Sequence, residues 1–251
     1  MNYPVIALWS HPRSMSTAFE RVMRARGDLE CLHEPFMYDY YINRSKRTMP
    51  HFDAEDQHPR NYEAIRDMIL EKAERGPVFF KDMSYYVVPH IFDDPVFLNR
   101  ITHSFLLRDL KASIVSYAKL DPDLTQEEIG IEAQWRLAEF LMKQNGSGPV
   151  VVQSERIRVD PHGQMRAYWN AVGLADKPEA LNWDDNAPKD WQQVSGWHQD
   201  VMSSKTIRPI TAEQELETEA NFDRLIAERP HFQLWHDHHD AFQRKLLAFA
   251  L

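Results

Sequence analysis

Arginine, serine and threonine side chains gather in a short turn near the start of the chain. Arg13, Ser14, Ser16 and Thr17 follow an apolar run, and helical character begins directly after them. Such a turn aims several backbone N–H groups at one point, and the helix adds the positive end of its dipole. Because Arg13 is a permanent cation with a fork of donors, this loop is predicted to bind a phosphate or sulfonate group. The alternative is that Ser14 or Ser16 only caps the helix and Arg13 is solvated.

A second candidate anion site lies about a hundred residues further on. Arg108 follows the apolar run 101–107, and Ser113 and Ser116 fall on the first two turns of the helix after it. A nucleotide that carries phosphates at both its 5′ and 3′ positions needs two such clusters. The alternative is a surface pair between Arg108 and Asp109, with Ser113 as an N-terminal cap.

Charged side chains also end two other apolar runs. His33 and Glu34 close the run that begins at Leu29, and Lys81 lies in the run 78–83. In an open parallel sheet the carboxyl ends of the strands meet at one edge, where ligands bind. Glu34 and Lys81 are therefore predicted to lie near Arg13. Lys81 could equally pair with Asp82 or Glu34, and Glu34 could form a salt bridge to Lys81 or Arg13.

Alternating strands and helices position these side chains. The apolar runs predict strands at 4–9, 29–35, 78–83, 101–107 and 149–153, and the intervening patterns predict helices at 18–26, 62–75, 110–120, 125–145, 163–172, 211–228 and 232–251. Thr125 with Glu128 forms a capping box, and Pro161 suits a first helical turn. We expect one α/β domain over 1–251, doubly wound, with a parallel sheet of about five strands flanked by helices.

Two segments stand outside this alternation. Residues 37–60 are irregular, aromatic and then polar, and are either a surface insertion or a lid over a substrate. Residues 191–251 read as a helical C-terminal extension. Its histidines, among them His236, suggest a solvated helix face rather than a metal site, because no second cluster at ligand spacing accompanies them.

Composition excludes several classes of protein. The chain has 251 residues and a net charge of −9, which argues against non-specific binding to nucleic acid or an anionic membrane. The single cysteine, Cys31, excludes an internal disulfide and a multi-cysteine metal site. No signal peptide or run of 18 apolar residues is evident, so a cytoplasmic location is expected. The Walker A pattern is absent, which counts against an ordinary ATPase or GTPase. The oligomeric state stays open.

Taken in order, these motifs resemble the sulfotransferase family that uses 3′-phosphoadenosine 5′-phosphosulfate (PAPS), over roughly residues 4–175. The tract from Ser10 to Thr17 resembles the family's 5′-phosphosulfate loop, and Arg108 with Ser116 resembles its 3′-phosphate motif. Lys81 lies where the family places a lysine near the transferred sulfonate. The tract from Trp9 to Phe36 looks most like a small bacterial branch with a P-loop-like fold.

The sequence departs from the family in three places. Met15 replaces the usual glycine of the 5′ loop, so that backbone must accept a side chain. Met83 falls near the catalytic histidine of the cytosolic enzymes and cannot accept a proton. The glycine-rich segment that closes over PAPS in those enzymes is not evident, although the tract from Trp197 to Lys205 is a candidate replacement.

The resemblance implies transfer of a sulfonate group from PAPS to a hydroxyl or amine of a small-molecule acceptor, without a metal. Arg13, Ser14, Met15, Ser16 and Thr17 would then hold the 5′ end of the donor, and Arg108 with Ser116 would hold the 3′ end. Glu34, Lys81 and Arg13 are the candidate catalytic residues. Glu34 is the expected base, with His33 and His198 as runners-up.

Two other functions stay open at this point. One is a protein that binds PAP (3′-phosphoadenosine 5′-phosphate) or a related nucleotide without catalysis, as Met15 and Met83 suggest. The other is an atypical P-loop phosphotransferase. The acceptor cannot be identified from the sequence, although the aromatic segment from Phe36 to Tyr41 with Tyr85 and Tyr86 suggests an apolar pocket.

Overall fold

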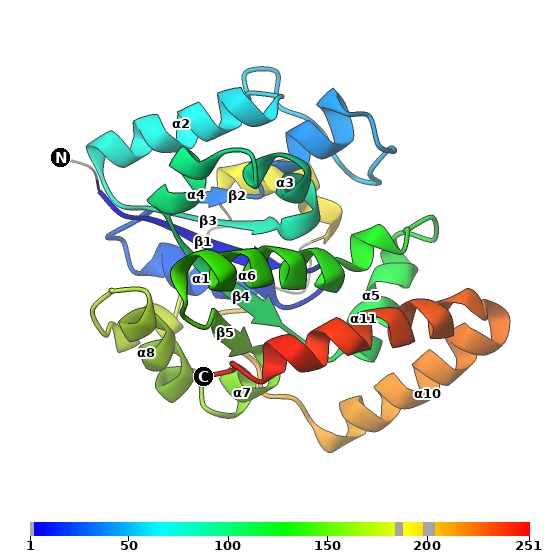
Figure 1. Ribbon diagram of the computed structural model, residues 1–251. Coiled ribbons are helices and arrows are strands. Elements are labelled where there is room, and N and C mark those ends of the chain that lie inside the picture. The colour runs from blue at the N-terminus through cyan, green and yellow to red at the C-terminus, as the bar shows by residue number, and fades with distance from the viewer. Residues whose placement is uncertain (1–2, 184–187, 198–203) are drawn as a thin grey trace.

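Five parallel strands form one sheet in the order β2-β3-β1-β4-β5 (Figure 1). The computed structural model describes residues 3–183, 188–197 and 204–251. The strands are β1 (Val5–Ser10), β2 (Glu30–His33), β3 (Val78–Met83), β4 (Ile101–Leu107) and β5 (Val150–Gln153). The register places Lys81 of β3 beside both Leu8 of β1 and His33 of β2. All five predicted strands are therefore present, in one α/β domain.

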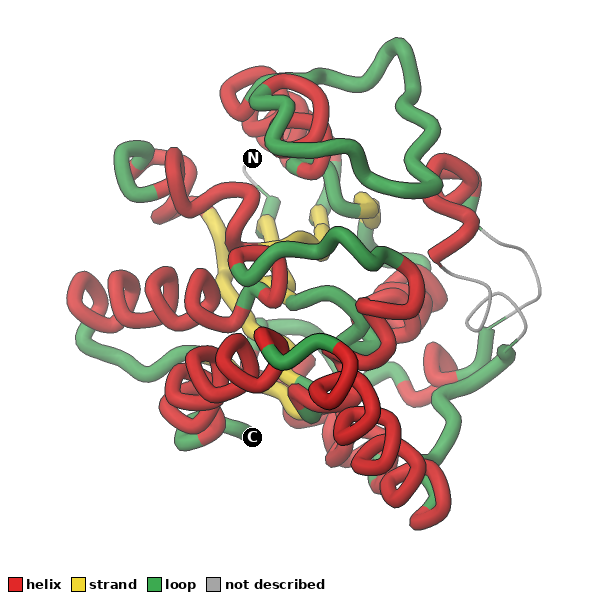
Figure 2. The backbone as a smooth tube through the Cα atoms, turned by 90° about the vertical axis from the view of Figure 1, so that its right-hand side faces the viewer, coloured by secondary structure: helices red, strands yellow, loops and turns green. Residues whose placement is uncertain are grey.

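Helices connect the strands and cover both faces of the sheet (Figure 2, strands in yellow). They are α1 (Ser16–Ala25), α2 (Tyr62–Arg75), α3 (Ser84–Ile91), α4 (Pro95–Arg100), α5 (Leu110–Leu120), α6 (Ile131–Asn145), α7 (Ser154–Val159), α8 (Pro161–Ala171), α10 (Ala212–Glu228) and α11 (His231–Leu247). Shorter helical turns are η1 (Asp39–Asn43), η2 (Glu127–Ile129), η3 (Pro178–Leu181) and η4 (Lys189–Trp197).

Strand β1 shows why the domain is doubly wound. Val5, Ala7 and Trp9 pack into one apolar cluster, together with residues of α2, α3, α5, α6 and α11. Ile6 and Leu8 point to the opposite face and pack against α1, α7 and α8. Successive side chains of a strand point to opposite faces, so a continuous apolar run is expected where both faces are covered. All six residues of β1 are buried.

The structure differs from the predicted helices in two ways. The predicted helix 125–145 is divided at Gly130, whose φ of 84° ends η2 and precedes α6. A side chain at Gly130 would approach the Tyr85 ring, 3.2 Å from its nearest carbon atom, so the position has neither the conformation nor the space for one. The sequence also missed α3, α4 and α7. Helix α3 contains Pro89 and a run of aromatic and β-branched residues, which favour strands locally.

The last two helices pack side by side as an antiparallel pair, drawn orange and red in Figure 1. Helix α10 lies against α5, and α11 lies against α6 and α5. Beyond α11, the N–H of Leu251 donates to the carbonyl of Val151 at 3.0 Å. The chain end therefore covers the outer edge of β5, which otherwise presents unpaired backbone groups.

Candidate functional site

The carboxyl ends of the strands bring the predicted site residues to one edge of the sheet. The loops after β1 and β4 diverge there, because α1 covers one face and α5 covers the other. Neighbouring strands whose connections leave in opposite directions create a crevice, which is the usual ligand site of an open α/β sheet. Arg13 follows β1 and Arg108 follows β4, so the two arginines flank this crevice.

The loop between β1 and α1 has an unusual backbone. Arg13 and Met15 have φ values of 63° and 73°, in the left-handed region that favours glycine. Residues with side chains persist there only when the surroundings hold them, and such strain is concentrated at functional sites. The Ser154 hydroxyl donates to the carbonyl of Ser14 at 2.5 Å, which fixes the loop from behind. The loop therefore accepts Met15 at a backbone position where glycine is the usual residue.

Within the described part of the chain, no side chain caps the start of α1, so the helix-capping alternative is wrong for Ser14 and Ser16. Met15 occupies the N-cap position, and the hydroxyl oxygen of Ser14 is buried with no hydrogen-bond partner among the described residues. The N–H groups of a first helical turn have no acceptor within their own helix. Ser16 and Thr17, at the start of α1, instead line a cavity.

The two predicted anion clusters lie in direct contact. Arg13 Nε donates to the hydroxyl of Ser116 at 2.9 Å, and Arg108 Nη1 donates to the carbonyl of Arg13 at 2.6 Å. Arg13 Nη1 also donates to the carbonyl of Trp197 at 2.6 Å. The two clusters are therefore parts of one crevice, and the Arg13 side chain extends from the first cluster into the second.

The helix after β4 also differs from the alternative proposed for it. Asp109 is the N-cap residue of α5 and accepts from the N–H of Ala112 at 2.7 Å. The Ser113 hydroxyl donates back to the Asp109 carbonyl at 3.0 Å and caps nothing. The Asp109 carboxylate is therefore used by the helix, and Arg108 turns toward the loop that carries Arg13.

A third arginine joins this group, and sequence reasoning missed it. Arg158, on α7, lines the same cavity as Arg13 and Arg108. Burial lowers the pKa of Arg108, and the positive charges of Arg158 and Arg13 lower it further. Three cations held close enough to repel one another form a site that favours an anion. We call Arg13, Arg108 and Arg158 the arginine cluster.

Beside the arginine cluster, Lys81 Nζ forms an ion pair with Glu34 Oε1. The exposed fractions of the two side chains are 1% and 7%, and both residues line the cavity. Glu34 has a φ of 44°, and its N–H donates to the carbonyl of Lys81 at 3.0 Å. This turn directs the Glu34 carboxylate toward β3. The predicted ion pair is therefore present at the carboxyl ends of the strands.

The polar contacts continue below Glu34 into the protein. His33 Nε2 lies 3.9 Å from Glu34 Oε1, and His33 Nδ1 lies 2.6 Å from Glu20 Oε2. The side chains of His33 and Glu20 are completely buried. Burial and the charge of Lys81 lower the pKa of His33 well below its usual value, so the imidazole is neutral. We call Glu20, His33, Glu34 and Lys81 the buried polar chain.

The cavity above both groups has a volume of about 440 Å³. Among the described residues that line it, Glu34 is the only acidic one. Other predicted site residues also line it, namely Arg13, Met15, Ser16, Thr17, Lys81 and Arg108, whereas Ser14 and Ser116 do not. Its far side is formed by residues that sequence reasoning did not single out: Thr206, Ile207, Arg208, Pro209, Thr211 and Gln214.

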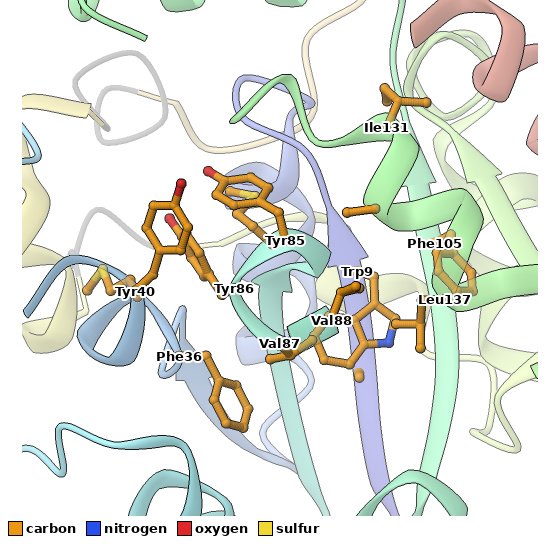
Figure 3. Packing of buried hydrophobic residues seen from close by; sticks show 14 of the residues in the cluster. Trp9, Phe36, Tyr40, Tyr85, Tyr86, Val87, Val88, Phe105, Ile131 and Leu137 are labelled. Atoms are coloured by element: carbon orange, nitrogen blue, oxygen red, sulfur yellow. The ribbon is translucent and has the colours of Figure 1, made fainter. Parts of the chain in front are cut away.

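Aromatic side chains form the wall next to Glu34. Tyr41, Tyr85, Tyr86 and Tyr117 all line the cavity. Figure 3 shows Tyr85 and Tyr86 beside Tyr40, with their hydroxyl ends turned the same way; the rings of Tyr85 and Tyr86 lie 4.7 Å apart. Of the aromatic residues that the sequence singled out, Tyr41, Tyr85 and Tyr86 line this wall, whereas Phe36 and Tyr40 do not. All four rings that line the wall also belong to the core.

Residues 37–60 cover one side of this cavity. Arg47 forms ion pairs with Asp121 and Glu128. Trp197 Nε1 donates to the carbonyl of Pro50 at 2.8 Å, and the N–H of Asp53 donates to the carbonyl of Gln193 at 2.8 Å. These contacts join the segment to α5, η2 and η4 at the cavity rim.

Two other predictions concern histidines. His198 lies outside the described residues. His236 contacts Asp237 at 3.1 Å, and no group of three potential metal-ligating side chains occurs among the residues described. None of the described helices combines the length and the apolar character that a membrane crossing requires.

Comparison with known proteins identifies relatives of the whole domain. A family model for a sulfotransferase domain matches residues 4–234. Two Arabidopsis thaliana proteins, branched-chain-amino-acid aminotransferase-like proteins 2 and 1, are 22% and 24% identical over 203 and 215 residues. Each alignment covers 80% of this chain, but the chain spans only 35% and 36% of those relatives.

Solved structures show the same fold. The sulfotransferase domain of the Synechococcus PCC 7002 olefin synthase superposes with a TM-score of 0.55 at 18% identity, covering 90% of this chain and 96% of that one. The sulfotransferase domain from the curacin biosynthetic pathway gives 0.53 at 12% identity, covering 90% and 98%. With a family model matched from the first strand to the last helix, this chain belongs to the sulfotransferase domain family.

Proposed function

We propose that this protein transfers a sulfonate group from PAPS to a hydroxyl or amine of a small-molecule acceptor. The observation that carries the proposal is one cavity faced by the N-terminus of α1, the arginine cluster and the Lys81–Glu34 pair. A bisphosphorylated nucleotide needs several cations within the length of one adenosine. An acceptor needs a base beside the sulfonate, and Glu34 is an acidic group adjoining those cations.

In this proposal each part of the cavity has one task. Arg13, Lys81 and the first N–H groups of α1 stabilise charge on the sulfonate and on the leaving 5′-phosphate. Arg108 and Arg158 hold the 3′-phosphate, and Ser116 orients Arg13 through its hydroxyl. Sulfonate transfer is an in-line displacement, so most of the rate enhancement comes from positioning and charge stabilisation, as in phosphoryl transfer.

Glu34 is the proposed general base. Among the described residues, Lys81 and His33 both approach its Oε1 atom, which leaves Oε2 for the acceptor. The acceptor oxygen or nitrogen forms a bond to sulfur, the bond from sulfur to the 5′-phosphate oxygen breaks, and the acceptor proton goes to Glu34. The nearby Met83 cannot take that proton, although it lines the cavity.

The Lys81–Glu34 ion pair also supports a second candidate, a protein that binds the nucleotide without turnover. A carboxylate that stays neutralised by lysine is a weak base, and only a bound sulfonate that draws Lys81 away would release it. The two candidates share the donor site and differ in catalysis.

Calorimetry with PAP, ATP and ADP tests the donor site. We expect PAP to bind at least ten times more tightly than ATP, because only PAP carries a 3′-phosphate for Arg108 and Arg158. Preference for ATP would overturn the proposal and favour a phosphotransferase. An acceptor screen with PAPS and mass-spectrometric detection then separates the two candidates. A sulfonated product supports the enzyme, whereas PAP binding without any product across the screen supports the binding protein.

A further inference from the structure

The polar side chains beneath Glu34 form more hydrogen bonds than the Lys81–Glu34 salt bridge needs. Glu20 lies on α1 and His33 lies on β2, so two elements from different layers meet at this contact. Glu20 Oε1 accepts from Arg24 Nε at 2.7 Å and from Trp191 Nε1 at 3.0 Å, while its Oε2 faces His33. Glu20 is thus a buried carboxylate held by three donors, and it is fixed in orientation.

These contacts determine which nitrogen of His33 carries the proton. A carboxylate accepts hydrogen bonds and cannot donate them, so the 2.6 Å contact with Glu20 requires the proton on Nδ1. In the neutral ring, Nε2 then carries a lone pair, and this lone pair faces Glu34 Oε1 at 3.9 Å. Toward an ionised Glu34 that arrangement offers no hydrogen bond. Toward a protonated Glu34 it offers an acceptor.

We propose that His33, held by Glu20, is a positioning residue that receives the acceptor's proton from Glu34. The carboxyl group of the protonated Glu34 turns its O–H toward His33 and closes the 3.9 Å gap to hydrogen-bond distance. The O–H bond then breaks and an N–H bond forms at His33 Nε2, which leaves a carboxylate on Glu34 and an imidazolium on His33. Glu20 compensates that new positive charge through Nδ1–H. The inference rests on the proposed function, because it assigns the route of the proton that the transfer reaction releases.

The charged groups around the two residues act on this route in both directions. Burial, Lys81 on β3 and Arg24 on α1 lower the pKa of His33, whereas the charge of Glu34 raises it and the Glu20 carboxylate faces its Nδ1–H. Asp82 and Tyr86 also face Glu34, and burial raises the pKa of each well above its usual value, although the N–H groups of Phe36 and Met83 donate to the Asp82 carboxyl group. Once the proton has moved to His33, Glu34 is again the anionic partner of Lys81.

Two variants test the inference, and both are compared with the wild type by turnover, PAP affinity and pH profile. Glu20→Gln keeps an oxygen that accepts from Nδ1–H but removes the charge that stabilises the imidazolium. We expect kcat to fall about 10-fold, less than the loss of the base itself. The acidic limb of the plot of kcat against pH should shift to lower pH by about one unit, because the loss of the negative charge of Glu20 lowers the basicity of His33. PAP affinity should stay within about 2-fold.

The second variant is His33→Gln, which should show the same loss of kcat. Its matched control is His103→Gln. His103 is a neutral histidine of β4 that bonds to Trp9 and to the carbonyl of Leu98, outside the residues that line the cavity. The control should lower stability without shifting the pH profile. A kcat profile that is unchanged in both Glu20→Gln and His33→Gln would overturn the inference.

A measurement on the wild type keeps the inference testable if the variants do not fold. The ¹⁵N chemical shifts of the His33 ring report its tautomer, and we expect the proton on Nδ1. A proton on Nε2 would overturn the inference, since that nitrogen could not then accept from Glu34. Failure of the proposed function is seen separately, as absence of PAP binding or of any sulfonated product.

Discussion

The arginine cluster and the buried polar chain adjoin the same cavity, but their charges are balanced differently. In the buried polar chain, Lys81 pairs with Glu34, and Glu20 pairs with Arg24 and contacts His33. In the cluster, the charges of Arg13 and Arg158 lower the pKa of Arg108, as burial does. A neutral histidine lies beside a cation in both regions. Burial and the charge of Arg108 lower the pKa of His11, next to the arginine cluster, to about 3, and burial and Lys81 lower the pKa of His33.

The difference distinguishes residues that stabilise the fold from residues that, in the proposed function, bind the donor. Breaking a buried ion pair costs roughly 3–5 kcal/mol, because one charge is left uncompensated. Removing a cation from the arginine cluster costs less, because neighbouring arginines repel it while Glu155 and Asp109 attract it. We therefore expect variants of the arginine cluster to lose PAP affinity with little change in stability, and variants of the buried polar chain to lose both stability and turnover.

The largest expected effect is that of Glu34→Gln. The change removes the proposed base, so kcat should fall by about 10²–10⁴-fold. It also leaves Lys81 without its anionic partner, so the free energy of unfolding in urea should decrease. PAP affinity measured by calorimetry should be nearly unchanged. Unchanged turnover would remove Glu34 from this role.

Arg158→Gln should show the opposite combination. The loss of one charge-assisted contact to a phosphate weakens PAP binding by about 10–100-fold. The melting temperature of the free protein should change little, because Arg158 is repelled by Arg108 but attracted by Glu155. Arg156→Gln is the matched control, because this exposed arginine of the same helix bonds to the carbonyl of Leu251. Equal PAP affinities in the two variants would contradict the assignment of Arg158.

His11→Asn tests the neutral histidine of the cluster through the pH dependence of stability. The pKa of His11 is about 3 in the folded chain and about 6.5 in an unfolded one. Its contribution to stability is therefore present above pH 6.5 and is lost as the pH falls from there toward 3. Between pH 6 and 4 the slope of unfolding free energy against pH should be smaller in the variant, by about 1.4 kcal/mol per pH unit. Identical slopes in urea titrations would contradict this.

The smallest expected effect is that of Met15→Gly in the loop of the cluster. Glycine adopts a φ of 73° without the steric cost that methionine has, although its unfolded chain is more flexible. We expect the free energy of unfolding to rise by about 0.5–1 kcal/mol, with PAP affinity retained. Met142→Gly in helix α6 should instead lower stability by about 1 kcal/mol. A loss of stability in Met15→Gly would show that packing of the side chain outweighs the backbone strain.

The sequence predicted those site residues that stand at the ends of strands. Arg13, Glu34 and Arg108 follow apolar runs, and parallel strands bring their carboxyl ends together whatever the loops do. The sequence could not predict that Arg13 reaches Ser116, because that contact depends on the side-chain path across the crevice.

Several of the missed residues lie on helices, where the position of a residue in the sequence says little about the direction of its side chain. Arg158 belongs to α7, a six-residue helix that sequence patterns did not predict. Glu20 looks like an ordinary polar residue of α1, and only the packing of α1 on β2 makes it the partner of His33. The residues from Thr206 to Gln214 carry only the capping box that Thr211 and Gln214 form at the start of α10, and they reach the cavity because α10 packs on α5.

The hydrogen bonds from Trp197 to Pro50 and from Asp53 to Gln193 join the segment 37–60 to η4 beside the cavity. They connect segments about 140 residues apart in the chain, and each is worth only about 1 kcal/mol net in water. Tyr38 also bonds to Gln193, and Arg13 Nη1 donates to the carbonyl of Trp197. Helix η4 is therefore held both by this segment and by the loop that carries Arg13, so three distant stretches of sequence support one another around the cavity.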